Sequence, residues 1–175
     1  MPVENWTSNQ LDDLIAFRRD LHENPELLYD VNRTAEKVAD ALRAAGLDEV
    51  VTGIGRTGVV GVIRGQTNKS GRAVALRADM DALPIFEETG AEWSSKVPGK
   101  MHACGHDGHT TMLLGAAREL AQSRAFDGTV IVIFQPAEDG GAGAKAMIDD
   151  GLFKRWPANE VYGMHIRPLL HVGTF

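Results

Sequence analysis

The chain has 175 residues, of which 43% are hydrophobic, and this is enough material for one domain with a single core. Its net charge of −6, without any long run of Lys and Arg, argues against binding to nucleic acid. No stretch approaches the ~18 apolar residues of a membrane span. The N-terminus lacks the features of a signal peptide, and a single cysteine excludes an internal disulfide. We therefore expect a cytoplasmic protein with neither a membrane nor a nucleic-acid partner.

Two amphipathic helices are predicted near the N-terminus. The first has apolar residues at helical spacing: Leu11, Leu14, Ile15 and Leu21. Ser8 or Thr7 can cap its start, and Asn24-Pro25 ends it. The second has an apolar stripe that ends before Gly46, the expected C-terminal cap: Ala35, Val38, Ala39, Leu42 and Ala45.

Two strand-like segments follow, Gly58 to Ile63 and Val74 to Asp79. The polar turn of residues 65–71 between them is short and predicts an antiparallel hairpin. The second segment turns acidic at its end, where Asp79 and Asp81 share one face. These carboxylates could orient a metal-binding histidine or bind metal directly, or they could simply belong to the turn at the strand end.

The run of residues 101–110 holds the only cysteine and three of the six histidines. Thiolate, imidazole and carboxylate are the side-chain groups that bind catalytic transition metals. In an extended segment Cys104 and His106 project to the same side and can reach one metal ion. Gly105 and Gly108 allow the segment to bend around such a site.

A helix rich in small residues is predicted from His109 to Ala121. We expect His109 to make a contact at the start of this helix and His102 to be a structural hydrogen-bonding residue. His22 lies at the end of the first helix, where a cation is favourable, and needs no chemical role.

Further candidate groups follow two apolar runs. The strand at 129–135 leads to Glu138 and Asp139, and the strand at 161–165 ends in His165, with a helix at 142–150 between them. Functional groups of open α/β sheets collect at the carboxyl ends of strands. Because adjacent side chains diverge, one acid can bind a metal while the other addresses a bound water. A polar loop and a surface histidine remain the alternative. The alternation predicts a mixed α/β sheet flanked by helices.

Five segments in order resemble the N-acyl-amino-acid amidohydrolases, a group that includes hippurate hydrolases and plant auxin-conjugate hydrolases and is related to di-zinc aminopeptidases and carboxypeptidases. The segments are Arg18–His22 with Pro25-Glu26, Arg77–Pro84, Met101–His109, Gln135–Gly141 and Gly163–His165. The resemblance implies a zinc-exopeptidase-like catalytic domain.

The resemblance also implies a site. Cys104, His106, Asp139 and His165 match metal ligands, and Glu138 matches the general base. The cofactor would be two divalent ions, Zn or Mn and possibly Co. The substrate would be an N-acyl amino acid, a small molecule, and the parent enzyme would be a homo-oligomer.

Three features depart from the family. Asp139 stands where Glu is usual, and Leu28-Tyr29-Asp30-Val31 replaces the usual Gly-Phe-Glu-Glu. Family members are also longer, with a lid and dimerisation domain and a second part of the catalytic domain that supplies one more histidine ligand. We therefore expect residues 1–175 to be the N-terminal part of the catalytic domain.

Two other functions stay open at this point. Cys104 could be a nucleophile paired with a histidine, as in cysteine hydrolases. The chain could also be a non-catalytic fragment that binds metal weakly or only makes protein contacts.

Overall fold

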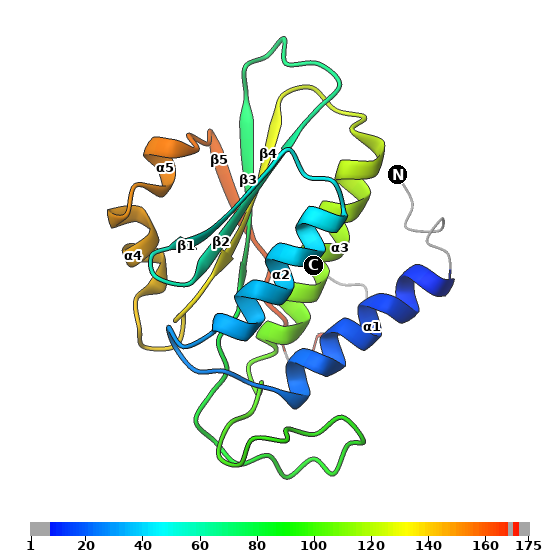
Figure 1. Cartoon of the computed structure of the whole chain (residues 1–175), viewed down its shortest axis with the longest axis vertical. Coiled ribbons are helices and arrows are strands. Elements are labelled where there is room, and N and C mark those ends of the chain that lie inside the picture. The colour runs from blue at the N-terminus through cyan, green and yellow to red at the C-terminus, as the bar shows by residue number, and fades with distance from the viewer. Residues whose placement is uncertain (1–7, 168–169, 172–175) are drawn as a thin grey trace.

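The computed structural model describes residues 8–167 and 170–171, and its centre is a five-stranded mixed sheet (Figure 1). The strands lie in the order β1-β2-β4-β3-β5. Their bounds are β1 Glu49–Ile54, β2 Gly58–Arg64, β3 Ala73–Asp79, β4 Thr129–Gln135 and β5 Glu160–Gly163. The predicted fold class, a mixed sheet flanked by helices, is confirmed.

The predicted hairpin between the second and third strands is wrong. β2 pairs with β1 and β4 in antiparallel orientation, whereas β3 runs parallel to both β4 and β5. β4 therefore lies between β2 and β3. Its residues are apolar on both faces, so the centre of the sheet buries β4 more completely than an edge position would.

Helices cover both faces of the sheet (Figure 1). The long helices α1 (Ser8–Glu23), α2 (Asn32–Ala44) and α3 (His106–Ser123) lie on one face. The short helices α4 (Gly143–Asp149) and α5 (Leu152–Arg155) lie on the other. Each face has its own apolar core: Phe134 of β4 belongs to the first, whereas the neighbouring Ile133 belongs to the second. This alternation explains why β4 is apolar without interruption from Val130 to Phe134.

Several element boundaries differ from those expected. β1 and α5 were not predicted, and α3 begins at His106 rather than at His109. α1 begins at Ser8; Thr7, the other expected cap, lies outside the described residues. β5 ends at Gly163, and Val161 and Tyr162 are exposed because β5 is an edge of the sheet.

The topology brings three loops together. Because β3, β4 and β5 are parallel, their carboxyl ends point to the same edge of the sheet, and the segments after these strands meet there. The long loop of residues 80–105 returns the chain from β3 to α3 at the lower end of the view (Figure 1). Within the part of the chain that the structure describes, no helix has both the length and the apolarity needed to cross a membrane.

Candidate metal centre

Side chains that can bind a metal ion gather where β3, β4 and β5 end and α3 begins. Among the described residues three groups have ligand atoms within 4.8 Å of one another: Cys104, His106 and His165; Asp79, His106 and His109; Asp81, His106 and Asp139. All four predicted ligands belong to these groups. The predicted base Glu138 lies beside them, with its Oε2 atom 3.7 Å from Nε2 of His106.

His106 is fully buried at the first position of α3. Its Nδ1 atom donates a hydrogen bond to the backbone carbonyl of Asp81 at 2.7 Å, which leaves a lone pair on Nε2. Among the described residues Nε2 has no hydrogen-bond partner, and it faces a carboxylate oxygen of Asp139 at 4.0 Å. Burial lowers the pKa of His106, but the hydrogen bonds and charges of Asp81 and Asp79 outweigh it and raise the pKa above its usual value.

The ring of His165 is oriented in the same way, by a hydrogen bond from Nδ1 to a backbone carbonyl. Its Nδ1 atom donates to the carbonyl of Ile166 at 2.7 Å, and its Nε2 atom lies 3.4 Å from Sγ of Cys104. Two ligands of one tetrahedral zinc ion, bonded at 2.0–2.3 Å, are about 3.5 Å apart, so this separation suits a shared ion. The expectation that Cys104 and His106 belong to an extended segment is wrong. Gly105 between them is left-handed (φ 84°), and this turn brings the two side chains together.

The acidic loop after β4 (residues 136–141) is held in place by the buried side chain of Asp81. The carboxylate of Asp81 accepts hydrogen bonds from the backbone N–H groups of Glu138 and Asp139, at 2.9 and 3.2 Å. The Oδ2 atom of Asp139 is buried and has no hydrogen-bond partner among the described residues. The side chain of Glu138 is 38% exposed, so it remains accessible to a small molecule.

His109 differs from the two histidines above because both of its ring nitrogens are in use. Nδ1 donates to a carboxylate oxygen of Asp79 at 2.7 Å, and Nε2 accepts the backbone N–H of Ile166 at 2.8 Å. Burial opposes ionisation of Asp79, but His109, His106 and Arg77 outweigh it and lower the pKa of Asp79. His109 therefore has no lone pair left for a metal ion, in agreement with the expected role as a contact at the start of the helix.

Negative charge dominates the surroundings of Cys104. Burial raises the pKa of its thiol, and the carboxylates of Asp139, Asp79, Glu138 and Asp81 raise it further. Among the described residues, Arg77 is the one Arg or Lys that forms an ion pair with any of these acids, and it pairs with Asp79. A divalent cation is the charge that would balance such a cluster.

A family model described as Peptidase family M20/M25/M40 matches residues 75–175, which is more than half of the chain. The chain belongs to this family. The resemblance inferred from the sequence is thereby confirmed.

Relatives of this M20-family chain are considerably longer. The hippurate hydrolase of Campylobacter jejuni is 52% identical over 87% of this chain and 39% of that protein. Thermostable carboxypeptidase 2 of Saccharolobus solfataricus is 47% identical over 99% of this chain and 42% of that protein. The Bacillus subtilis YXEP protein, described as a dinuclear metal-binding peptidase of the M20 family, has a TM-score of 0.88 at 41% identity, over 94% of this chain and 45% of that one. The chain thus spans about two fifths of the length of these relatives.

A second polar cluster of the M20-family chain, behind the candidate ligands, was missed by the sequence analysis. Nδ1 of His22 lies 2.7 Å from a buried oxygen of Asp107, and Arg18 pairs with the same oxygen at 2.8 Å. The hydrogen bond with Asp107 raises the pKa of His22, against the effect of burial. His22 thus anchors α1 to α3 and is more than a cation at a helix end. The spacing of Arg18 and His22, four residues apart on one helix face, was the available signal.

The expectation that His102 is a structural hydrogen-bonding residue is wrong. This residue is buried beside His22, with ring centroids 6.3 Å apart, but neither ring nitrogen has a hydrogen-bond partner among the described residues. Burial lowers the pKa of His102 to about 4, so the ring is neutral near pH 7. It is not a structural hydrogen-bonding residue within this part of the family domain.

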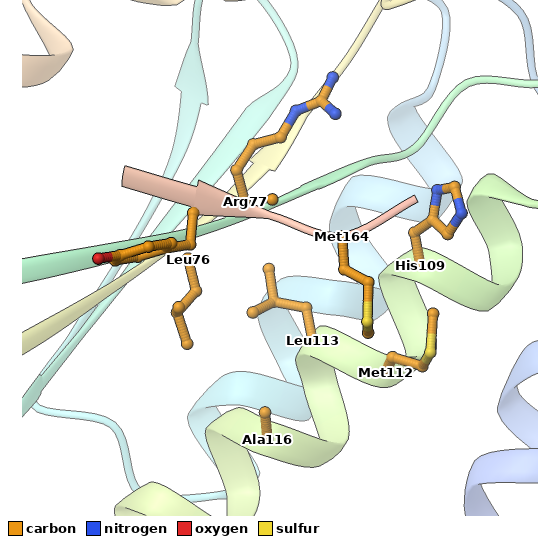
Figure 2. A pocket seen from close by; sticks show the side chains of 9 residues that line it. Leu76, Arg77, His109, Met112, Leu113, Ala116 and Met164 are labelled. Carbon is orange, nitrogen blue, oxygen red and sulfur yellow. The ribbon is translucent and has the colours of Figure 1, made fainter. Parts of the chain in front are cut away.

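An apolar pocket of about 210 Å³ lies next to the cluster, between α3 and the strands β3 and β5. Figure 2 shows Met112, Leu113 and Ala116 of α3 facing Leu76 of β3 and Met164, with His109 at the margin. Neither the candidate ligands Cys104, His106 and Asp139 nor Glu138 line this pocket. His109 and Arg77 line the pocket and also contact Asp79, so they connect it to the candidate centre.

Proposed function

We propose that the whole protein is a metal-dependent amidohydrolase that cleaves the amide bond of N-acyl amino acids. Two relatives, named hippurate hydrolase and thermostable carboxypeptidase, support hydrolysis of an amide beside a carboxylate-bearing residue. The observation that carries the proposal is a pair of imidazole Nε2 atoms: that of His165 lies beside the Cys104 thiol, and that of His106 faces the unpartnered Oδ2 atom of Asp139.

The proposed metal ligands are Cys104, His106, Asp139 and His165. A buried Nε2 atom and a buried carboxylate oxygen without partners would each carry a desolvation cost, which coordination to a cation would remove. The hydrogen bonds from Nδ1 of both histidines to backbone carbonyls fix the ring orientation that such ligands require. Thiolate, imidazole and carboxylate together suit zinc, manganese or cobalt, and the relative described as dinuclear supports two ions.

Glu138 is the proposed general base. When bound, divalent ions supply Lewis acidity that polarises an amide carbonyl and makes a neighbouring water more acidic. Glu138 is the partly exposed carboxylate of the acidic pair, so it can accept the proton of that water and later donate it to the leaving amine. The hydrogen bonds from the loop N–H groups to Asp81 keep this carboxylate in place.

The contact between Cys104 and His165 also favours a second function, that of a cysteine hydrolase. The charges around the thiol oppose it. A nucleophilic thiolate is stabilised by neighbouring cations, whereas Cys104 is surrounded by the carboxylates that raise its pKa. We therefore favour the ligand role for Cys104.

The test uses the protein encoded by the complete gene, stripped with a chelator and reloaded with zinc or manganese. Hippurate and N-acetyl-methionine are the substrates, and released amino acid is measured. Glu138→Gln should bind metal normally and lose at least 100-fold in hydrolysis, because an amide cannot accept the proton. Glu119→Gln, on the exposed face of α3, is the matched control and should behave like the wild type.

Cys104→Ser and Asp139→Ala should each lower the bound metal measured by elemental analysis. Bound metal should also protect Cys104 from iodoacetamide. Unchanged metal content in both variants, or alkylation that ignores excess metal, would instead favour the cysteine hydrolase. Hydrolysis of peptides with a free C-terminus but not of N-acyl amino acids would refute the proposed substrate class.

A further inference from the structure

A second support of the acidic loop comes from outside the candidate centre. The hydroxyl of Tyr29 donates a hydrogen bond to the backbone carbonyl of Gly141 at 2.5 Å. The carbonyl of Leu28 accepts the backbone N–H of Ala137 at 3.0 Å. These two hydrogen bonds lie on either side of Glu138 and Asp139, so the segment of residues 28–29 spans the loop that carries both acids.

The backbone around this loop, residues 136–143, is also tightly packed within itself. Ala137 has a positive φ of 51°, which non-glycine residues rarely adopt. A Cβ atom on Gly141 would lie 2.5 Å from Cβ of Ala137, and one on Gly143 would lie 1.7 Å from the carbonyl oxygen of Pro136. The backbone of the loop is therefore packed against itself. A displacement of Gly141 is transmitted to Asp139, two residues away.

Tyr29 is itself fixed. The guanidinium of Arg56, in the turn between β1 and β2, stacks over its ring at 4.1 Å from the centroid. The hydroxyl of Thr57 donates to the backbone carbonyl of Tyr29 at 2.9 Å. The ring and the backbone of Tyr29 are thus both anchored to the turn between β1 and β2, and its hydroxyl has a defined position.

We propose that Tyr29 is a positioning residue that acts through Gly141 to hold Asp139 within reach of the metal ion, a role that rests on the proposed function. Asp139 has a short side chain, with one methylene between the backbone and its carboxyl group. A short side chain cannot compensate for a backbone shift by changing its rotamer as Glu can. The position of the carboxylate therefore depends on the position of the loop, which is held by hydrogen bonds to Asp81 and to Tyr29.

Tyr29→Phe removes the hydroxyl and keeps the ring, so it is the direct test in the protein encoded by the complete gene. Zinc affinity is measured by competition with a chelating indicator. We expect about a tenfold loss, the lower end of the range for residues that orient metal ligands. In the cobalt-loaded protein the thiolate-to-metal absorption of Cys104 should persist, because the other ligands stay in place.

Tyr162→Phe is the matched control, since Tyr162 is the only other tyrosine and its hydroxyl hydrogen-bonds to Glu160 at the exposed edge strand. It should leave zinc affinity unchanged. A double-mutant cycle with Asp139→Glu adds a readout that a purely structural role would not move. The longer carboxylate should reduce the effect of Tyr29→Phe to about twofold or less.

Each outcome decides the inference. Wild-type zinc affinity in Tyr29→Phe, while Cys104→Ser and Asp139→Ala lose metal, would overturn the role of Tyr29 and leave the proposed function intact. An equal loss with Asp and with Glu at position 139, or loss of the folded state in Tyr29→Phe, would assign the hydroxyl to stability alone. Retention of metal by both ligand variants would overturn the proposed function, and the inference with it.

Discussion

Nε2 of His109 accepts the backbone N–H of Ile166 at 2.8 Å, and this hydrogen bond connects α3 to the segment that carries His165. On the other side of the ring, Nδ1 donates to Asp79, which Arg77 also contacts at 2.7 Å. The carboxylate fixes the imidazole in one tautomer, and the imidazole fixes the backbone beside His165. His109 thus supports a candidate ligand without being one.

His109→Ala should loosen the segment around His165. It removes both hydrogen bonds and leaves the buried Asp79 with fewer partners, so the free energy of unfolding should fall by about 1–3 kcal/mol. Zinc affinity should fall about tenfold. Urea denaturation of the metal-free protein and a zinc titration measure the two effects. Gln122→Ala, an exposed position of the same helix, should change neither; a complete loss of zinc would instead indicate that His109 is a ligand.

Asp81→Asn should weaken the hydrogen bonds that hold the acidic loop. An Asn side chain has one acceptor oxygen, so its NH₂ group would oppose one of the two N–H groups of Glu138 and Asp139. We expect a loss of about 1–3 kcal/mol in the free energy of unfolding, measured in urea without metal. Asp13→Asn, exposed on α1, serves as the control. Equal stability of the two variants would contradict the bracing role of Asp81.

Gly143→Ala should distort the same loop from its far end. The added Cβ would lie 1.7 Å from the carbonyl oxygen of Pro136, a backbone atom that cannot rotate away. We expect about 1–3 kcal/mol of destabilisation in urea. Hydrolysis should fall in parallel, since Glu138 lies on the displaced segment. Lys145→Ala on α4 is the control, because Lys145 is exposed.

Acid should destabilise the loop of residues 65–72 between β2 and β3, which is hydrogen-bonded to Asp127. Hydrogen bonds from Ser70, Thr67 and Lys69 hold the pKa of Asp127 well below its usual value. A carboxyl with a lowered pKa in the folded state stabilises the fold above its unfolded pKa of about 3.9, and this contribution is lost as the pH falls below that value. Amide exchange at Lys69 and Ser70, corrected for intrinsic rates, should therefore accelerate from pH 4 downward. Asp127→Asn should abolish this dependence, and its persistence there would point to another carboxyl.

The sequence predicted individual elements better than their pairing. β2, β3 and β4 are apolar and short, and α2 has a clear stripe, so local patterns were sufficient. The hairpin failed because a short polar link is compatible with both hairpin and non-adjacent strands, and the insertion of β4 depends on residues far along the chain. β1 was missed because its strand is half exposed and contains Gly53.

In the candidate site, too, individual residues were easier to predict than their long-range contacts. Cys104 and His106 could be proposed from residue type and spacing, and Glu138, Asp139 and His165 from their place after apolar strands. Asp79 and Asp81 could likewise be proposed as residues that orient a histidine. Other supporting contacts could not be predicted, because their partners are remote: His22 and Asp107 are 85 residues apart, and Tyr29 and Gly141 are 112 apart. Hydrogen bonds of this kind leave no periodic signal in one sequence.

The sheet order also has a consequence for the time at which the candidate centre can form. Cys104 and His165 are 61 residues apart, and β5, which precedes His165, pairs with β3 among the described strands. A ribosome therefore releases the thiol long before the imidazole, and parallel pairing over such a separation is slow. Until β5 docks, the nascent chain offers an ion only part of its shell. Binding of an ion by both Cys104 and His165 therefore has to follow the docking of β5 on β3.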